Sequence, residues 1–342
     1  MNTLPTIRYM GIKSHLLDKI IPAIKKVTPE NGVVLDLMAG SNTVSYALKE
    51  FFTVYTNDVQ KYSEVISKAV IENQSETISS DSAKKDLSFE KNKEYHFFEQ
   101  TYSGTYFSKE QCIAIDNLRY AIEQVENEYK KDLYLLALMC AMCKVQSTPG
   151  HFAQFMPSEH KRIIPLQKMD LLEVFYEKCD NYSELCFTDK KNKCFCGDYK
   201  ELLFGINSGV NSGVNEVDTI YLDSPYSGEQ YSRFYHILET VVKYDSPSVN
   251  FKAKYREDRF RSGFCYKNRV KDEFENIMSF CKTNGINLVI SYSNKGVLPV
   301  GELETFGKNY FKKTELLKID YKHSTQGKGS KELEEVVLIC SN

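Results

Sequence analysis

Four short apolar runs, each followed closely by an aspartate, constrain the fold of this 342-residue chain most strongly. The runs read VVLDL, FFTVYTND, KCFCGD and VDTIYLD, and their aspartates are Asp36, Asp58, Asp198 and Asp223. Short apolar runs bounded by turn residues are typical of buried parallel strands. Because ligands of open α/β sheets bind at the carboxyl ends of the strands, the four acids predict one ligand site at one sheet edge.

Segments with helical periodicity alternate with these runs at 7–27, 43–50 and 61–73, which is how a parallel α/β sheet begins. The α/β pattern resumes near residue 193, continues through a helix in KDEFENIMSFCKTNG and a strand in INLVISYS, and closes with an antiparallel pair in FKKTELLKIDYKHS and LEEVVLICSN. A tandem NSGV repeat within 206–216 predicts a flexible surface loop.

The segment between the two α/β parts is charged, tyrosine-rich and mostly helical, with helices expected at 109–128 and 131–144. We therefore predict an α/β fold that carries a helical insertion. The predicted divisions are a first catalytic part at 1–75, the insertion at 76–193 and a second catalytic part at 194–342.

Cysteine usage and apolar content exclude secreted and membrane-spanning classes of protein. Ten cysteines without a secretion signal predict reduced thiols. A CxxC at Cys140 and Cys143 lies at helical spacing on an apolar face, where core packing is the favoured interpretation, so no metal site is expected. The longest apolar stretch, 133–142, is half the length that a bilayer requires, so we expect a cytoplasmic protein with no membrane partner.

The sequence LDLMAGSNTVSYALK is typical of a strand, a tight turn and a helix that approach a polar ligand closely. Asp36 ends the strand and can reach a cationic group, while Gly40 permits a close approach. Asp58 follows the glycine turn at about the spacing of an acid that binds ribose hydroxyls. Each acid alone also fits a helix cap or a loop position, but the coincidence of four favours a ligand site.

The fourth apolar run ends in Asp223-Ser224-Pro225-Tyr226, which is a rigid polar loop at the expected sheet edge. The acid and the backbone can accept hydrogen bonds from an amino group, and the aromatic ring can stack on a flat ring. This combination predicts a site for a planar substrate that carries an exocyclic amine, such as a nucleobase.

The net charge is −2, so any nucleic-acid surface must be local. Residues 251–271 alternate cations with aromatic rings, the two components of a DNA cleft. The expected phosphate contacts are Arg256, Arg259, Arg261 and Lys267, with Phe264 and Tyr266 nearer the bases. Candidates for target reading in the insertion are His151, Gln154, His160, Lys161 and Arg162. A solvated surface is the alternative interpretation of both segments.

In this order, the segments resemble the alpha-group, Dam-like family of DNA adenine-N6 methyltransferases. The matching segments are RYMGIKSHLLDKI, DLMAGSNTVSYALK, TNDVQKYSEVI, FCGDYKELL, DSPYSGEQYSRFYHILET and VISYSNKGVL. The resemblance implies a Rossmann-like sheet that binds S-adenosylmethionine and a helical insertion that is the target-recognition domain. It implies Asp58 on the ribose, Val59 against the adenine ring and Asp198 near the cofactor adenine. The implied cofactor-binding residues are Tyr9, Met10, Gly11, Lys13, Asp36, Met38, Ala39, Gly40, Ser41, Asn42, Asp58, Val59, Asp198, Tyr199 and Asp223.

Two residues depart from the family pattern. Asn42 stands where the family usually has glycine, and because asparagine tolerates a positive φ, we expect the turn to persist. Ser224 stands where the family usually has proline or another small residue, and that position acts through its backbone carbonyl. Pro225 still biases Ser224 toward extended geometry. Neither change removes a functional group, so we expect an active enzyme.

The resemblance implies an enzyme that flips an adenine out of double-stranded DNA and methylates its N6 atom. Asp223 and the Ser224 carbonyl would accept hydrogen bonds from the amino group, and Tyr226 would stack on the base. The alternatives are an N4-cytosine DNA methyltransferase and a degenerate methyltransferase that is a non-catalytic DNA-binding module. An RNA or protein-amide methyltransferase fits the motif order less well. No nuclease motif is recognisable, so a separate cognate restriction endonuclease is a candidate partner, with restriction–modification, phage protection and regulation all open as roles.

Overall fold

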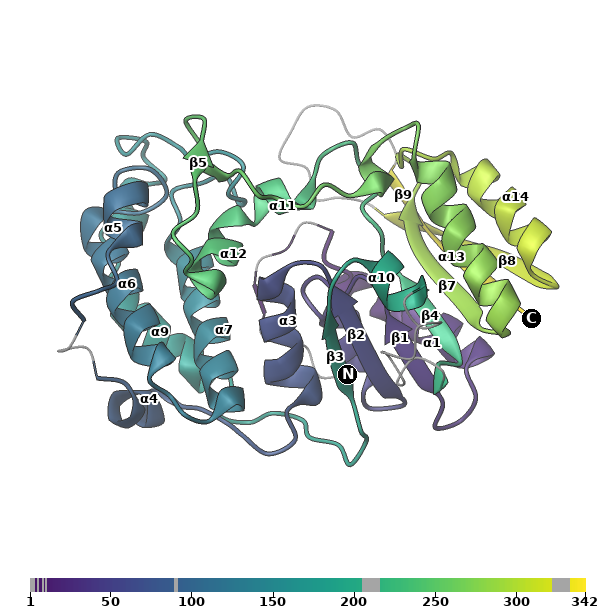
Figure 1. The fold of residues 1–342 in the computed structure, drawn as a ribbon, viewed down its shortest axis with the longest axis horizontal. Coiled ribbons are helices and arrows are strands. Elements are labelled where there is room, and N and C mark those ends of the chain that lie inside the picture. The colour runs from purple at the N-terminus through teal and green to yellow at the C-terminus, as the bar shows by residue number, and fades with distance from the viewer. Residues whose placement is uncertain are drawn as a thin grey trace.

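The computed structural model describes Leu4, Thr6, Ile7 and Tyr9, together with residues 11–88, 92–204, 216–321 and 333–342. A seven-stranded sheet in the order β3-β2-β1-β4-β7-β9-β8 forms its centre (Figure 1). The pairs are parallel, except that β9 runs antiparallel to β7 and to β8. The strands are β1 (Val33–Asp36), β2 (Thr53–Asp58), β3 (Lys193–Cys196), β4 (Thr219–Leu222), β7 (Asn287–Ser293), β8 (Lys313–Tyr321) and β9 (Leu333–Ser341). The predicted α/β fold and its closing antiparallel pair are confirmed.

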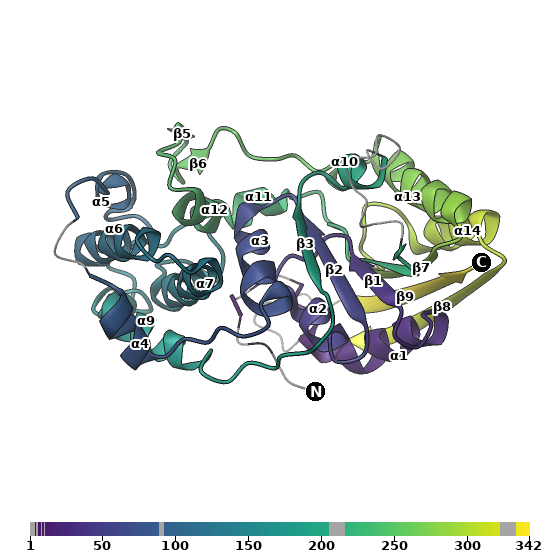
Figure 2. The ribbon, with the colours of Figure 1, turned by 60° about the horizontal axis from the view of Figure 1, so that its bottom comes forward.

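Helices cover both faces of this sheet (Figure 2). One face packs against α1 (Leu17–Val27), α2 (Thr43–Leu48) and α3 (Lys61–Ser67), and the other against α10 (Tyr199–Phe204), α13 (Val270–Asn284) and α14 (Val300–Tyr310). Val34 and Val54 point into the first core, whereas Leu35 and Tyr55 point into the second. Because successive side chains of a strand alternate between faces, each apolar run supplies both cores, as is usual for parallel sheets.

The segment between β2 and β3 continues from α3 into a helical region. Its helices are α4 (Ser80–Asp86), α5 (Phe97–Tyr102), α6 (Lys109–Glu123), α7 (Glu128–Val145), α8 (Ile164–Gln167) and α9 (Leu171–Asp180). Most of α7 is buried, because it packs against α6 and α9 on one side and against α3 on the other. Cys140 is one of its buried residues and carries a free thiol within the apolar core.

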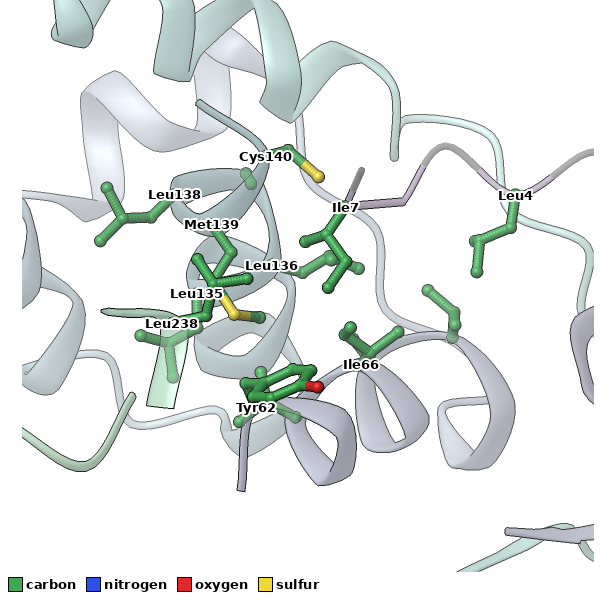
Figure 3. Close-up of a cluster of buried hydrophobic side chains, with 14 of the residues drawn as sticks. Leu4, Ile7, Tyr62, Ile66, Leu135, Leu136, Leu138, Met139, Cys140 and Leu238 are labelled. Atoms are coloured by element: carbon green, nitrogen blue, oxygen red, sulfur yellow. The ribbon is translucent and has the colours of Figure 1, made fainter. Parts of the chain in front are cut away.

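The contact between α7 and α3 joins the helical region to the sheet. Figure 3 shows α7 residues beside α3, α12 (His236–Lys243) and the N-terminal segment. The labelled side chains of this cluster include Ile7, Tyr62, Ile66, Leu135, Leu136, Met139 and Leu238. All three predicted divisions therefore contribute to one continuous hydrophobic core.

The chain after β4 returns to the helical region. It forms α11 (Tyr231–Phe234), α12, and a two-stranded hairpin of β5 (Val249–Asn250) and β6 (Tyr255–Arg256). The Tyr106 hydroxyl lies 2.8 Å from the carbonyl oxygens of Phe152 and Ala253, and the Phe152 N–H donates to the Phe234 carbonyl at 2.9 Å. These bonds tie the start of the 251–271 segment to the insertion rather than to the sheet.

Several predicted boundaries move. The helix expected over 109–128 ends at Glu123, and α7 begins at Glu128 because the Asn127 side chain caps it by accepting from the Lys130 N–H. The helix expected over 61–73 becomes π-helical over Lys68–Glu72. Helix α14 was not predicted. Residues 206–215, which carry the NSGV repeat, lie outside the described residues. Within the described parts of the chain, no helix is both long and apolar enough to cross a membrane.

Candidate functional site

A cavity of about 300 Å³ opens at the carboxyl ends of β1, β2, β3 and β4. The structure brings Asp36, Asp58, Asp198 and Asp223 together on its wall. Other residues expected at the site that line the cavity are Tyr9, Gly11, Lys13, Met38, Ala39, Gly40, Ser41, Val59, Tyr199, Ser224 and Pro225. Met10 lies outside the described residues. The cavity has the size of a small-molecule pocket and lies where ligands of open α/β sheets bind.

The turn after β1 is held in shape from both sides. Gly40 has a φ of +50°, and a Cβ atom there would lie 3.0 Å from the Tyr9 hydroxyl, so the position requires glycine. Asp58 accepts hydrogen bonds from the Gly40 N–H at 2.9 Å and the Gln60 N–H at 2.8 Å. The Asp58 carboxylate, which was predicted to bind a ligand, therefore also fixes the turn. Each of its two oxygens still has a lone pair that can accept a hydrogen bond from a ligand.

Asn42 adopts the left-handed conformation that was expected, with a φ of 60°. Its side chain is buried and does not line the cavity, which differs from its expected role as a cofactor contact. Instead, its Nδ2 donates to the Ser63 carbonyl at 3.3 Å and its Oδ1 accepts from the Ser67 Oγ at 2.7 Å. Asparagine thus ties the turn to α3, which glycine could not do.

Asp36 has one satisfied and one unsatisfied oxygen. Its Oδ2 accepts from the Ser45 Oγ at 2.5 Å, while its Oδ1 is buried and has no hydrogen-bond partner among the described residues. Burial raises the pKa of Asp36 to about 7, although the Ser45 hydrogen bond opposes the rise. A buried acceptor beside a cavity favours a ligand that brings a cationic or hydrogen-bond-donating group.

Lys13 forms an ion pair with Asp223, with 2.8 Å between Nζ and Oδ1. The ammonium also donates to the Gly11 carbonyl at 3.0 Å. Burial lowers the pKa of Lys13, but the Asp223 carboxylate together with Tyr226 and Glu335 more than offsets this effect, and the Lys13 pKa is raised. Burial likewise raises the pKa of Asp223, although Lys13 opposes that rise. Lys13 was expected to touch a cofactor, yet its direct partner here is the acid of the Asp-Ser-Pro-Tyr loop.

The rest of that loop divides between the cavity and its surroundings. Ser224 is buried, and its Oγ has no hydrogen-bond partner among the described residues. Tyr226 does not line the cavity: its ring packs edge-on against Tyr292 with centroids 6.3 Å apart, and the Lys13 Nζ lies 5.5 Å from its centroid. Tyr231 lines the cavity instead. The sequence singled out Tyr226 by its motif, but which of two nearby tyrosines faces a cavity depends on the packing of β7.

The part of the cavity wall that follows β3 contains a polar cluster around Glu273 that the sequence did not predict. The Tyr199 hydroxyl donates to Glu273 of α13, and the Lys200 Nζ lies 2.8 Å from the same carboxylate. Asp198 accepts from the Lys200 N–H at 3.0 Å. Further lining residues that were not predicted are Gln230, Ser232, Arg269 and Glu273. They come from helices and loops far along the chain, and no local motif marks them.

The 251–271 segment does not present its charges uniformly. Arg256 is 1% exposed and forms ion pairs with Asp245 at 2.6 Å and Asp258 at 2.8 Å. Phe264 is also 1% exposed and packs against Tyr199 and Phe274. The expectation that Arg256 contacts phosphates and Phe264 approaches bases is therefore wrong for this structure, because both side chains are committed to the interior.

The remaining cations of this segment are more accessible. Arg259 stacks on Tyr255, with 4.7 Å from the guanidinium to the ring centroid, and donates to the Arg256 carbonyl. Arg261 is exposed and lines the cavity, and Lys267 is exposed. Tyr266 is half-buried beneath Arg269.

The insertion loop is mostly exposed, as a binding or a solvated loop would be. Gln154, His160, Lys161 and Arg162 are exposed. His151 is half-buried, its ring lies 4.9 Å from that of Phe234, and burial lowers its pKa.

A mostly parallel sheet with a closing antiparallel strand, a glycine turn and an acidic second strand end is typical of α/β proteins that bind nucleotide-like ligands at this edge. The chain belongs to the D12 class N6 adenine-specific DNA methyltransferase family, whose model matches residues 9–305.

Three curated relatives are modification methylases. The chain is 31% identical over 330 residues to modification methylase LlaI of Lactococcus lactis subsp. lactis, a match that covers 89% of this chain and 49% of the relative. It is 28% identical to modification methylase StsI of Streptococcus sanguinis, over 89% of this chain and 46% of the relative. It is 27% identical to the type II methyltransferase M.FokI of Planomicrobium okeanokoites, over 89% of this chain and 47% of the relative. The chain therefore spans about half the length of these relatives.

Proposed function

We propose that this protein transfers a methyl group from S-adenosylmethionine to N6 of an adenine flipped out of double-stranded DNA. The observation that carries the proposal is that Asp223, Ser224 and Pro225 line the same cavity as the glycine turn and Asp58. Membership of an adenine-specific family supports adenine over cytosine. Its Dam-like subgroup remains a proposal from motif order.

The residues present fit this cofactor. The unpartnered Asp36 Oδ1 suits the ammonium group of the methionine part, and Asp58 and Val59 at the end of β2 suit the ribose and the adenine ring. When bound, S-adenosylmethionine supplies an electrophilic methyl group on a sulfonium centre. Asp36, Asp58 and Asp223 line one cavity, which supports a single binding site for this cofactor beside the Asp-Ser-Pro-Tyr loop.

Asp223 and the Ser224 carbonyl would each accept one hydrogen bond from the amino group of the base. Two acceptors on the two N–H bonds direct the nitrogen lone pair toward the methyl donor and stabilise the charge that develops on nitrogen. Pro225 holds Ser224 in extended geometry so that its carbonyl can take part. Tyr226, or its neighbour Tyr231, which already lines the cavity, would stack on the base.

Asp223 accepts this hydrogen bond most strongly, and stabilises the developing positive charge, when it is ionised. The contribution of Asp223 to the methylation rate is therefore present above the Asp223 pKa and is lost as the pH falls through that pKa. Because burial raises the pKa of Asp223, the loss should occur at a higher pH than for an exposed aspartate.

The helical region at 76–193 is the proposed target-recognition domain, and 1–75 with 194–342 forms the catalytic domain, whose β5–β6 hairpin packs on the helical region. Arg261 and Lys267 are the best-placed phosphate contacts of the 251–271 segment because both are exposed. Similarity to modification methylases favours a role in restriction–modification beside a separate cognate endonuclease.

The decisive experiment incubates the purified protein with unmethylated genomic DNA and S-adenosylmethionine and measures methylated nucleosides by mass spectrometry. We expect N6-methyladenine, and about 10²- to 10³-fold less of it with Asp223→Asn, because the neutral amide oxygen cannot stabilise the positive charge that develops on nitrogen as a carboxylate does. Asp272→Asn, an exposed acid on α13, is the matched control and should match the unmodified protein. N4-methylcytosine would replace the proposed base, and cofactor binding without any methylated base would favour a non-catalytic DNA-binding module.

A further inference from the structure

Glu335 is a buried glutamate that the proposed reaction does not use. It lies on the same face of the sheet as Tyr221, which precedes Asp223 by two residues. Glu335 of β9 pairs with Ser293 of β7, and it is 6% exposed. Strand alternation places it on the face that carries Tyr221 and Ser291, whose hydroxyl oxygens are 2.9 Å apart. Glu335 also lies beyond residues 9–305, so the family match says nothing about it.

Glu335 and Lys13 have complementary unused hydrogen-bonding capacity. The Glu335 Oε2 atom is buried and has no hydrogen-bond partner among the described residues. The Lys13 ammonium has three N–H donors, and the bonds described for it go to Asp223 and Gly11. Lys13 and Glu335 attract each other electrostatically, although no direct ion pair joins them within the described residues. A buried acceptor without a partner is costly, and Lys13 is the cation whose charge acts on Glu335.

We propose that Glu335 is a positioning residue that acts on Asp223 through Lys13. The inference rests on the proposed function, in which Asp223 accepts a hydrogen bond from the amino group of the base. Lys13 occupies the Asp223 Oδ1 atom in this structure, so a base that uses this oxygen would share it with the ammonium. A rotation of the Lys13 side chain toward Glu335 would release that oxygen for the base while keeping the ammonium paired.

The charge of Glu335 also couples directly to Asp223. Burial raises the pKa of Glu335 to about 7, with Lys13 opposing the rise and Asp223 adding to it. The titratable groups that interact with it are Lys13 from the N-terminal segment and Tyr221, Asp223 and Tyr226 from β4 and its loop. The adjacent strand β7 contributes the hydroxyls of Ser291 and Ser293 on the same face. An ionised Glu335 disfavours an ionised Asp223, so removal of its charge should lower the pKa of Asp223.

The test follows the Asp223 carboxyl carbon by ¹³C NMR in the full protein without DNA, with Asp223→Asn identifying the signal. In the unmodified protein we expect a second titration step near pH 7, which reports Glu335. Glu335→Gln should remove that step and lower the pKa of Asp223, whereas Lys13→Met should raise it. Glu334→Gln is the matched control, since its side chain points to the opposite face of β9 and should change nothing.

The pH profile of methylation gives a second readout. Glu335→Gln should move the acid limb of kcat to lower pH by the same amount, with KM for DNA unchanged. An unchanged Asp223 titration in Glu335→Gln, or an equal shift in Glu334→Gln, would overturn the proposal. If Glu335→Gln does not fold, the titration of the unmodified protein still tests the proposal. Absence of the second Asp223 titration step near pH 7 would also contradict it. The NMR titration needs no turnover. A protein that methylates no base would therefore refute the proposed function, while the titration alone would still decide whether Glu335 is coupled to Asp223.

Discussion

The carboxyl edge of the sheet and the 251–271 segment are both rich in charged residues, but they use charge differently. At the sheet edge, acids predicted from separate parts of the sequence converge on one cavity. In the 251–271 segment, neighbouring cations have opposite fates: Arg256 is buried between two aspartates, whereas Arg261 and Lys267 are exposed.

The difference comes from what fixes each side chain. Parallel strands end at a common edge, so a residue's place after a strand determines its place in space. A long connection has no such rule, and its side chains are placed by contacts with remote partners. Asp245 and Asp258 flank β6 and supply the carboxylates that bury Arg256. A lysine or arginine in a loop is therefore a candidate DNA contact only when no nearby carboxylate within the protein pairs with it.

The sharpest test of this comparison is Arg256→Met. Loss of a buried guanidinium with hydrogen bonds to two carboxylates should lower the free energy of unfolding by about 3 kcal/mol. Arg261→Met is the matched control and should change stability little, because its side chain is exposed. Chemical denaturation of both variants measures the difference. Equal stability of the two would show that the buried ion pairs do not hold the hairpin.

At the sheet edge, Asn42→Gly would restore the residue that the family usually has at this turn. We expect a loss of about 1 kcal/mol, because the Ser67 hydroxyl loses its acceptor while the backbone gains little. Asn31→Gly is a close control, since Asn31 is also left-handed, with a φ of 58°, but is exposed. Thermal unfolding should separate the two, and an unchanged midpoint for Asn42→Gly would contradict the assigned side-chain role.

The smallest effect is expected for Lys267→Gln. Removing one exposed phosphate contact should reduce the slope of log affinity against log salt by about 1, with stability unchanged. Fluorescence anisotropy of labelled duplex DNA over a salt series measures that slope. Lys19→Gln, an exposed lysine on α1, provides the comparison. A slope that does not change would remove Lys267 from the DNA-binding surface.

The sequence was sufficient to predict the sheet because each strand was an apolar run bounded by turn residues. The left-handed conformation of Asn42 was also expected, because the resembling family usually has glycine at this position and asparagine tolerates a positive φ. It could not place Tyr226 or Glu335, because their surroundings come from β7 and β9, whose register is set only when the sheet closes. Helix α14 was missed because its few buried residues give weak periodicity.

The mostly buried helix α7 bears on how the proposed target-recognition domain could acquire new DNA specificities. Exchange of a recognition module between relatives is simplest when its borders pass through solvated linkers. Here the borders that the sequence suggests would cut through the packing of α7 against Tyr62 and Ile66 of α3. A recombinant that takes 76–193 from another protein would need compatible apolar surfaces on α3 and α12 as well. Diversification by substitution at exposed loop positions such as Lys161 and Arg162 leaves that packing intact, so point changes there offer the easier evolutionary route.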